Sequence, residues 1–317
     1  NLDSENEGSL WVSCAGGVSG NSYLPVQRVD ASGEKLSVKI CGLTGGHSGA
    51  EIDKNRASAN ILMGQFLYEL GAVCGYALAE LEGGQKDNAI PRECQASILV
   101  LPEEVSAVSS LAEKMQKDFR EEYTGSDENI TIQVTKEGEA DASVLHPTSQ
   151  EKVIFYLMNL PFGVKKMSGT IEGLVETSCN PGILKLYGDE LFVQTSIRSA
   201  VGTAKEALSH KIQYLTEFLG GEYDTEGDYP AWEYRKDSPL RDKMVEVYRD
   251  LYGKELKVVA IHAGLECGLF YERMEGLDCT SLGPDILDIH TSEERLDMGS
   301  VKRVWEYLIE VLKNLKD

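Results

Sequence analysis

The sequence has few cations and no long apolar run, and each absence excludes a class of partner. Lys and Arg number 31 against 52 Asp and Glu, which leaves a formal net charge of -21 over 317 residues. A chain this acidic repels phosphate backbones and anionic lipid surfaces, so we expect no nucleic-acid partner and no membrane partner. No apolar run approaches the roughly 18 residues of a membrane-spanning helix, so no segment is predicted to cross a bilayer.

Paired cysteine motifs are also absent. None of the seven cysteines forms a C-x-x-C pair, which excludes the common zinc-finger and thioredoxin motifs. Most of the cysteines lie in apolar contexts, such as Cys41 after Val38-Lys39-Ile40 and Cys74 after Ala72-Val73. The pattern predicts buried free thiols in a reducing cytosol, and therefore a cytoplasmic protein.

What remains is the composition of an ordinary globular protein. Hydrophobic residues make up 42% of the chain and charged residues 26%, and the length predicts two or three domains. The chain begins at Asn1 rather than at a methionine, in a segment that resembles the end of a strand. We therefore expect a piece of a longer protein.

Helix and strand periodicities alternate over residues 34–134. Strands are predicted at 34–41, 74–81, 90–101 and 130–134, and helices at 55–70 and 102–123. The resulting order β-α-β-β-α-β is the split βαβ pattern of a ferredoxin-like layer.

A second stretch repeats this order more loosely. Helices are predicted at 149–160 and 203–219 and strands at 174–186 and 191–199, with a hairpin turn at Tyr187-Gly188-Asp189-Glu190. The Gly-, Ser- and Asn-rich residues 15–22 are predicted to break the first strand and to form a domain junction. The fold class is therefore α/β (α+β), with two ferredoxin-like α/β halves.

The pattern changes after Tyr229-Pro230. Helices are predicted from Ser238 onward, at 264–271 and at 300–315, and strands at 256–261 and 279–282. This order suits one edge of an α/β sheet with covering helices, but it is too short for a complete doubly wound domain. Part of the sheet is expected to come from elsewhere.

One candidate catalytic residue is His47, in Gly45-Gly46-His47-Ser48-Gly49 between a predicted strand and a predicted helix. Small residues around a single His leave the imidazole exposed and let a ligand approach the backbone closely. The same residues also fit a tight turn with a merely solvated histidine.

Two candidate metal ligands lie near opposite ends of the chain. Asp3 follows a predicted strand end, where open α/β sheets place ligands and where a carboxylate can bind a divalent cation. His290 lies in a loop before the last helix, and a neutral imidazole is a common metal ligand. On local sequence alone, Asp3 is more often a capping or surface carboxylate and His290 more often an ordinary loop histidine.

Three further residues are candidates for ligand binding. Asn88 precedes a predicted strand and fits a turn as well as a binding site. Arg198, at a predicted strand end, can hold a carboxylate with two hydrogen bonds or form a structural ion pair. The segment His262-Ala263-Gly264 joins a strand to a helix and can offer backbone N–H groups to an anion. His146 and His210 are interpreted as structural.

Taken in order, five motifs resemble one family. They are Asn-Leu-Asp-Ser-Glu from Asn1, Gly-Leu-Thr-Gly-Gly-His-Ser-Gly from Gly42, Asp-Asn-Ala-Ile-Pro-Arg-Glu from Asp87, Thr-Ser-Ile-Arg-Ser from Thr195, and Ile-His-Ala-Gly-Leu-Glu-Cys-Gly-Leu-Phe from Ile261. The family is the aminoacyl-histidine dipeptidase (Xaa-His dipeptidase, peptidase D) branch of the two-zinc M20 metallopeptidases. The resemblance covers essentially the whole chain.

The resemblance implies roles for the residues that match its motifs. Asp3 matches a ligand of one zinc and His290 a ligand of the other. His47 matches a histidine of the lid domain that stabilises the oxyanion of the tetrahedral intermediate.

Three residues match the family's substrate contacts. Asn88 and Arg198 match lid residues that hold the dipeptide, with Arg198 on its terminal carboxylate. Gly264 matches a backbone contact to the same carboxylate.

The resemblance also divides the chain. Residues 1–14 correspond to a remnant of the catalytic domain, 15–229 to a lid and dimerisation domain, and 230–317 to the C-terminal part of the catalytic domain. The upstream half of the family's catalytic domain, with a His, a bridging Asp and two Glu, has no counterpart here. We expect that this fragment binds zinc poorly and is inactive by itself.

The predicted function of the parent is hydrolysis of Xaa-His dipeptides by a cytoplasmic homodimer that pairs through the lid. The implied cofactor is a pair of zinc ions, with cobalt or manganese as alternatives. Two other interpretations stay open. One is a non-catalytic lid-type module for dimerisation or peptide binding, and the other is a deacylase or aminoacylase on the same scaffold.

Overall fold

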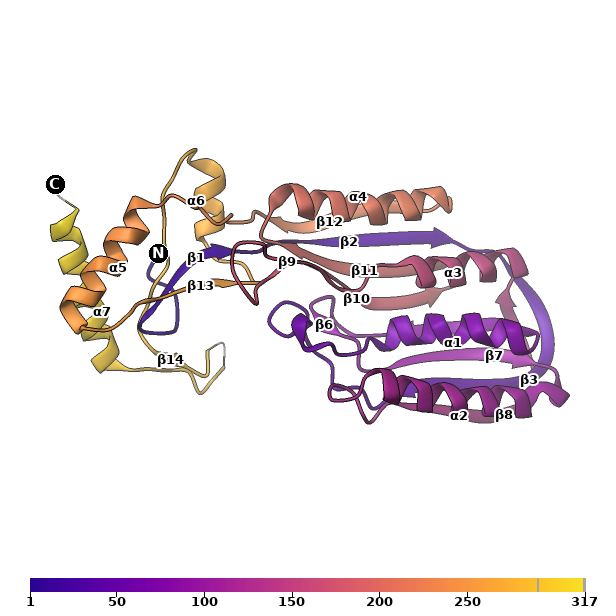
Figure 1. Ribbon diagram of the computed structural model, residues 1–317. Helices are drawn as coiled ribbons and strands as arrows, with labels where there is room; N and C mark the ends of the chain where they lie inside the picture. Colours follow the sequence, from indigo (N-terminus) through magenta and orange to yellow (C-terminus); the bar gives the residue numbers. More distant parts are fainter. Residues whose placement is uncertain (290, 316–317) are drawn as a thin grey trace.

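The computed structural model describes residues 1–289 and 291–315. Figure 1 shows a long sheet with helices against it, joined at one end to a smaller part that holds both ends of the chain. Among the described residues, no helix is long and apolar enough to cross a membrane.

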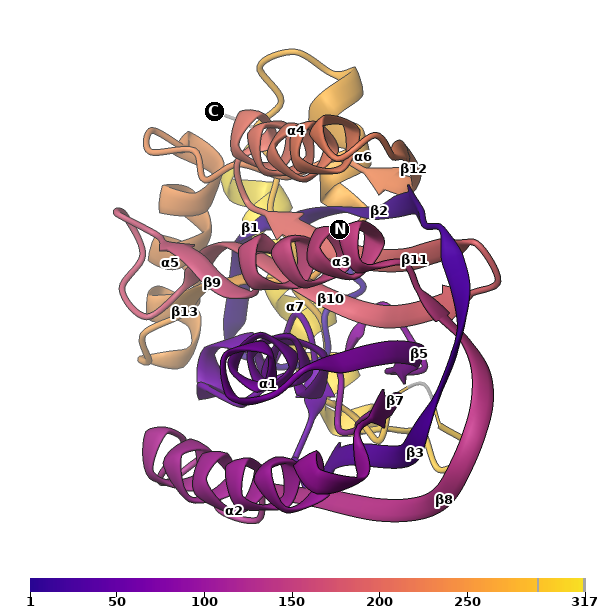
Figure 2. The ribbon, with the colours of Figure 1, turned by 90° about the vertical axis from the view of Figure 1, so that its right-hand side faces the viewer.

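One antiparallel sheet of nine strands dominates the larger part. Its order is β12-β2-β11-β10-β5-β7-β3-β8, and β9 pairs with β10 beside this path. The strands are β2 (Gly16–Pro25), β3 (Arg28–Cys41), β5 (Tyr76–Gly83), β7 (Cys94–Val100), β8 (Thr131–Leu145), β9 (Gly163–Met167), β10 (Val175–Tyr187), β11 (Glu190–Ser199) and β12 (Glu222–Tyr229). Figure 2 shows one face covered by α1 (Ala59–Val73), α2 (Val105–Glu122), α3 (Pro147–Asn159) and α4 (Gly202–Phe218).

The first predicted ferredoxin-like half is confirmed. The order β3-α1-β5-β7-α2-β8 along the chain becomes the spatial order β5-β7-β3-β8, which is the split βαβ arrangement. The alternation in β3 explains its orientation. Leu36, Val38 and Ile40 are fully buried in the hydrophobic core, whereas Ser37 and Lys39 between them point to the helix-free face.

The second half takes its first strand from far upstream. Strands β12-β2-β11-β10 have the same spatial arrangement as β8-β3-β7-β5, with β2 in the place of β3. The first half is therefore inserted between the first strand and the first helix of the second half. Two ferredoxin-like halves were predicted, but their nested connection was not.

The predicted strand break at residues 15–22 is wrong, because residues 16–22 lie within strand β2 between β11 and β12. Its glycines serve close packing rather than a break. A Cβ at Gly17 would collide with the hydroxyl of Tyr229, and one at Gly20 with the hydroxyl of Tyr223. Glycine inside a strand marks such a close approach, and composition alone does not distinguish it from a loop.

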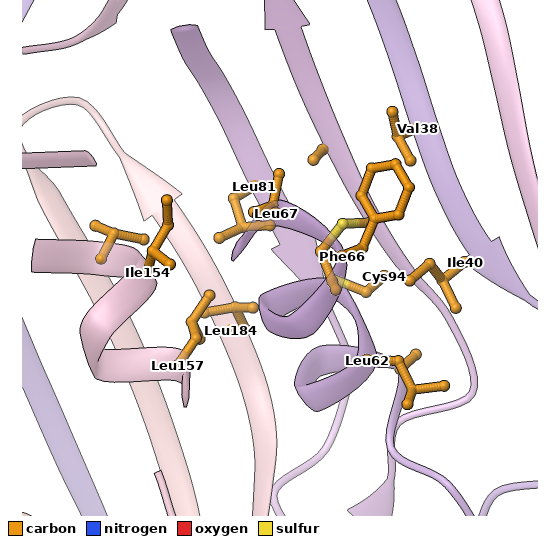
Figure 3. Close-up of a cluster of buried hydrophobic side chains, with 14 of the residues drawn as sticks. Val38, Ile40, Leu62, Phe66, Leu67, Leu81, Cys94, Ile154, Leu157 and Leu184 are labelled. Carbon is orange, nitrogen blue, oxygen red and sulfur yellow. The ribbon is translucent and has the colours of Figure 1, made fainter. Parts of the chain in front are cut away.

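The two halves share a hydrophobic core although few residues join their strands. Strands β10 and β5 pair only at Leu184 with Gly83 and at Lys185 with Glu82. Figure 3 shows Phe66 and Leu67 of α1 among side chains from both halves, including Leu157 of α3. Gly64 lets these helices approach, because a Cβ there would lie 2.8 Å from the Cβ of Leu157. Burial of each large apolar side chain contributes about 1.5–3 kcal/mol.

The smaller part has hydrophobic cores of its own. Its strands β1 (Ser9–Cys14) and β13 (Lys257–Ile261) pair in parallel. Its helices are α5 (Pro239–Tyr252), α6 (Cys267–Arg273) and α7 (Met298–Asn314). The short strands β14 (Ile286–Leu287) and β15 (Arg295–Leu296) pair nearby. The cap of α5 at Ser238 is confirmed, since the Ser238 Oγ accepts from the Arg241 N–H at 3.0 Å.

Two predicted elements of this part differ from the structure. The strand predicted at 279–282 does not form, because Ser281 makes only an isolated bridge to Trp11. Helix α6 begins at Cys267 and not at Gly264, because residues 262–266 form a loop against the large sheet. Strand β1 continues into β2 through Ala15 alone, so this loop lies beside the connection between the two parts. The domain limits at 14/15 and 229/230 stay a prediction.

Candidate functional site

A row of paired residues crosses four strands at the end of the large sheet that adjoins the smaller part. Tyr229 of β12 pairs with Gly17 of β2, Gly17 with Arg198 of β11, and Arg198 with Ser178 of β10. The neighbours Ile197 and Cys179 belong to the core under the helices. Because side chains alternate along a strand, the row faces the helix-free side.

Arg198 is a half-buried cation without an acidic partner in this row. Its Nη1 donates to the Tyr229 hydroxyl at 2.8 Å, and the missing side chain at Gly17 leaves room for the tyrosine ring. The Arg198 Nε is buried and has no hydrogen-bond partner among the described residues. Nor does any described carboxylate pair with its guanidinium, so the structural ion pair that could have explained Arg198 does not form there.

His262, from the smaller part, contacts the Ser178 end of this row. Its Nε2 lies 2.7 Å from the Ser178 Oγ, and the residue is only 6% exposed. The pKa of His262 is lowered to about 4, mainly by burial and then by the charge of Arg198, against the smaller raising effects of the Val175 carbonyl and Asp53. The imidazole is therefore neutral near pH 7.

His47 lies on a short ladder, β4 (Gly46–His47) paired with β6 (Ala89–Ile90). Its Nδ1 accepts from the backbone N–H groups of Gly49 at 3.1 Å and Ala50 at 3.0 Å. Burial and then the charge of Arg198 lower the pKa of His47, so the ring is neutral and its proton lies on Nε2. The exposed loop thus presents an N–H donor.

A carboxylate and a glycine fix this loop. Glu51 accepts from the His47 backbone N–H at 3.0 Å and pairs with Arg56 at 2.8 Å. The His47 N–H lowers the pKa of Glu51 most, followed by Arg56, so the carboxylate stays charged. Gly49 lies against the carbonyl oxygen of His262, where an added Cβ would be only 2.7 Å away. The His47 loop therefore contacts the 262–266 loop directly.

Asn88 lies on the loop beside His47, and its position depends on a strand residue. The Asn180 Nδ2 of β10 donates to the carbonyls of Asp87 at 2.8 Å and Ala89 at 2.9 Å. The Asn88 carbonyl accepts from the Ser48 N–H at 2.9 Å. The Asn88 side chain is exposed and makes no hydrogen bond to the described residues, so its amide is available to a ligand.

Gly264 lies on the other side of the row. A Cβ there would be 2.8 Å from Cε2 of Tyr229, so the loop backbone packs directly on the tyrosine ring. The Gly264 N–H donates to no described residue. The structure therefore brings four of the predicted site residues to one junction, namely His47, Asn88, Arg198 and Gly264.

The predicted metal ligands stand apart from this group. Asp3 is exposed, and its N–H donates to the Asn1 Oδ1 at 3.0 Å. His290 lies outside the described residues. Within 1–289 and 291–315, no three His, Cys, Asp or Glu side chains come together to hold a metal ion. The described residues therefore do not by themselves fit a two-zinc site.

Sequence analysis missed four residues that build the site, which are Ser178, Asn180, Tyr229 and the His262 side chain. A signal existed for two of them. Ser178 and Asn180 alternate along β10 with Cys179, which lies in the core. Polar residues at that period mark the face opposite the core, but the register against Arg198 cannot be inferred from the sequence.

The chain is similar to known proteins. Residues 38–127 match the family described as the peptidase dimerisation domain of the M20 type. The chain is 32% identical to the cytosol non-specific dipeptidase of Escherichia coli (strain K12), over 99% of this chain and 65% of that protein.

A solved structure is also similar. The aminoacylhistidine dipeptidase of Vibrio alginolyticus matches with a TM-score of 0.94 and 31% identity, over 99% of this chain and 64% of that one. The chain thus spans less than two thirds of either relative. These matches confirm the resemblance to the aminoacyl-histidine dipeptidase branch of the M20 peptidases, and with it the mixed α/β fold.

Proposed function

We propose that this chain, with its M20-type dimerisation domain at residues 38–127, is part of a cytoplasmic dipeptidase that hydrolyses Xaa-His dipeptides. Residues 15–229 are its lid, and residues 1–14 and 230–317 belong to its catalytic domain. The names and similarity of the two relatives support a peptidase. The preference for a C-terminal histidine rests on the motifs alone.

The observation that carries the proposal is Arg198, a half-buried guanidinium with no described acid partner. A cation in that position favours an anionic ligand, and a guanidinium binds a carboxylate through two parallel hydrogen bonds. A dipeptide presents its free carboxylate close to the scissile bond. Arg198 therefore binds that carboxylate, and the free N–H of Gly264 adds a second donor.

The remaining groups act on the peptide bond itself. The exposed amide of Asn88 holds the backbone of the dipeptide. The Nε2–H of His47 donates to the carbonyl oxygen as it gains negative charge in the tetrahedral intermediate. Such a donor stabilises the transition state more than the bound substrate, because the charge is absent from the ground state.

The proposed hydrolysis is metal-dependent, and the steps above describe only what the side chains and backbone of this chain do. We retain Asp3 and His290 as proposed ligands of one zinc each, with cobalt or manganese as alternatives. Any such site needs ligands besides those that the structure describes. From this we expect that the 317-residue chain alone, with zinc added, hydrolyses no Xaa-His dipeptide at a measurable rate.

The pairing of the sheet limits which surfaces can form the proposed homodimer. Strand β5, within the matched residues 38–127, is already paired with β10 of the same chain. Among the described residues, the sheet has free edges at β8, at β12 and at β9, which pairs only with β10. A homodimer through the lid therefore uses one of these edges or the outer surfaces of the helices, and light scattering of the purified protein measures its mass.

Three substrates test the proposal on the whole protein. A dipeptidase hydrolyses a dipeptide with C-terminal histidine faster than the C-terminal amide of that dipeptide. A deacylase or aminoacylase instead prefers an N-acyl amino acid. If the protein hydrolyses none of the three but binds the dipeptide, the proposal fails and a peptide-binding module is the better interpretation.

A further inference from the structure

His262 is a buried titratable residue that the proposed steps do not use. It lies between β13 and α6, in the smaller part, yet its ring reaches the large sheet and meets Ser178 at 2.7 Å. Ser178 is itself only 1% exposed. A buried hydrogen bond between side chains 84 residues apart in sequence fixes the relative position of two segments.

The segments that this bond joins both contact the proposed carboxylate subsite. Ser178 lies directly opposite Arg198 in the β10–β11 register, so the two side chains are neighbours on one face. Two residues beyond His262, Gly264 packs on Tyr229, which accepts the hydrogen bond from Arg198. The bond therefore sets the position of the Gly264 N–H relative to the guanidinium.

We propose that His262 is a positioning residue that, through Ser178, holds the Gly264 loop against the Arg198–Tyr229 pair, so that loop and guanidinium form one subsite for the free carboxylate of a peptide. The inference rests on the proposed function and specifies its recognition step. His262 does not contact the substrate, since its Nε2 is engaged and its Nδ1 is buried.

The type of residue matters at this position. A carboxylate beside Arg198 would pair with the guanidinium and remove the charge that the substrate needs. A lysine would place a second cation beside it. An apolar side chain would leave the buried Ser178 hydroxyl without a partner, which is costly in a site closed to water. A neutral imidazole engages Ser178 and leaves the charge of Arg198 uncompensated.

The test compares two substrates in four variants of the whole protein. Ser178→Ala and His262→Leu each remove the hydrogen bond, whereas His262→Gln keeps a polar atom at the position of Nε2. Ser97→Ala is the matched control, because Ser97 is also a buried serine of the same sheet and its Oγ has no partner among the described residues. The substrates are a dipeptide with C-terminal histidine and its C-terminal amide.

Ser178→Ala and His262→Leu are expected to raise KM for the dipeptide by roughly five- to tenfold, the typical effect of a lost buried hydrogen bond. The kcat stays within about twofold, and KM for the amide does not change, because the amide lacks the charged group. His262→Gln and Ser97→Ala stay near the wild type. The double variant Ser178→Ala/His262→Leu is no worse than either single variant, since both remove the same interaction.

The inference is overturned if KM changes equally for the dipeptide and the amide, or if Ser178→Ala behaves like Ser97→Ala. Either result would show that the His262–Ser178 hydrogen bond contributes to packing in general and not to carboxylate recognition. Failure of this inference can be distinguished from failure of the proposed function. If the wild-type protein hydrolyses neither compound, the proposed function fails, and titration calorimetry with the same two compounds and variants decides the inference through Kd.

Discussion

Replacing Gly49 with alanine would test whether the contact between the two loops positions His47. An added Cβ at Gly49 would lie 2.7 Å from the His262 carbonyl oxygen, and 3.1 and 3.2 Å from two atoms of the His47 ring. Carbon–oxygen contacts in proteins lie at about 3.3–3.6 Å, so one loop must move by about 0.6 Å or more. Gly49 has no positive φ, so the effect is steric rather than a strain of the backbone.

We expect Gly49→Ala to lower both the stability of the protein and its kcat. Overpacking of this kind costs about 1–3 kcal/mol in a core, and we expect the lower end for a loop that can shift. A misplacement of about 1 Å near the reacting groups can lower the rate 10²-fold, so a shift of about half that size is expected to lower kcat by roughly tenfold. A shift of the His47 loop changes the dipeptide KM less, whereas a shift of the 262–266 loop, which carries Gly264 of the proposed carboxylate subsite, raises it.

The assay is steady-state hydrolysis of a dipeptide by the whole protein, together with urea unfolding. Gly75→Ala is the matched control, because Gly75 is an exposed glycine without positive φ and a Cβ there would meet nothing within 4 Å. If Gly49→Ala has the same kcat as Gly75→Ala and the wild type, the loop contact does not position His47 and the argument is refuted.

The other predictions concern single side chains of the same junction. His47→Ala is expected to lower kcat about 10²–10³-fold with little change in KM, as for the loss of one oxyanion donor; a rise in KM alone would show that His47 is only a binding residue. Arg198→Ala is expected to raise KM for the dipeptide about 10–100-fold but not for its amide, because a hydrogen bond to a charged group contributes about 1.5–3 kcal/mol; equal losses on both compounds would contradict its role. The pKa of His262 falls from 6.5 to about 4 on folding, so the unfolded chain binds the extra proton first and stability declines as the pH falls from about 6.5 towards 4, by up to roughly 3 kcal/mol. Urea unfolding at pH 7 and pH 5 should show a smaller decline for His262→Gln than for the wild type, and an identical decline would mean that His262 titrates normally.

Periodicity in the sequence was sufficient for most elements of the large sheet. Its strands and helices have either the period of two seen at Leu36, Val38 and Ile40 or the helical spacing of Leu62, Phe66 and Leu67. It failed at β2, where Gly16, Gly17 and Gly20 resemble a loop. Tyrosine rings of β12 lie over Gly17 and Gly20, and the backbone of residues 229–231 lies against Gly16. A contact between residues about 200 positions apart leaves no local signal.

The candidate site was predictable only in part, for a related reason. His47, Asn88, Arg198 and Gly264 each occur in a motif that resembles a family, so sequence could name them. Their mutual arrangement depends on register, which the sequence does not display. The connection between Arg198 and Ser178 exists because β10 and β11 pair with those two residues opposite each other. A shift by one residue would place Ser178 on the core face.

The nested connection explains how one strand comes to organise the site. Because the first half is inserted after β2, the loop that carries His47 and the loop that carries Asn88 both belong to the inserted half, whereas β10 belongs to the other half. On its helix-free face β10 presents Ser178 to His262 of the smaller part and Asn180 to the Asn88 loop. Two polar residues of β10 therefore bind two separate loops, one in the smaller part and one in the inserted half. Each of these hydrogen bonds is buried or partly buried, so losing one partner leaves an unpaired polar group. Separation of the loops from β10 therefore costs the free energy of that unpaired group.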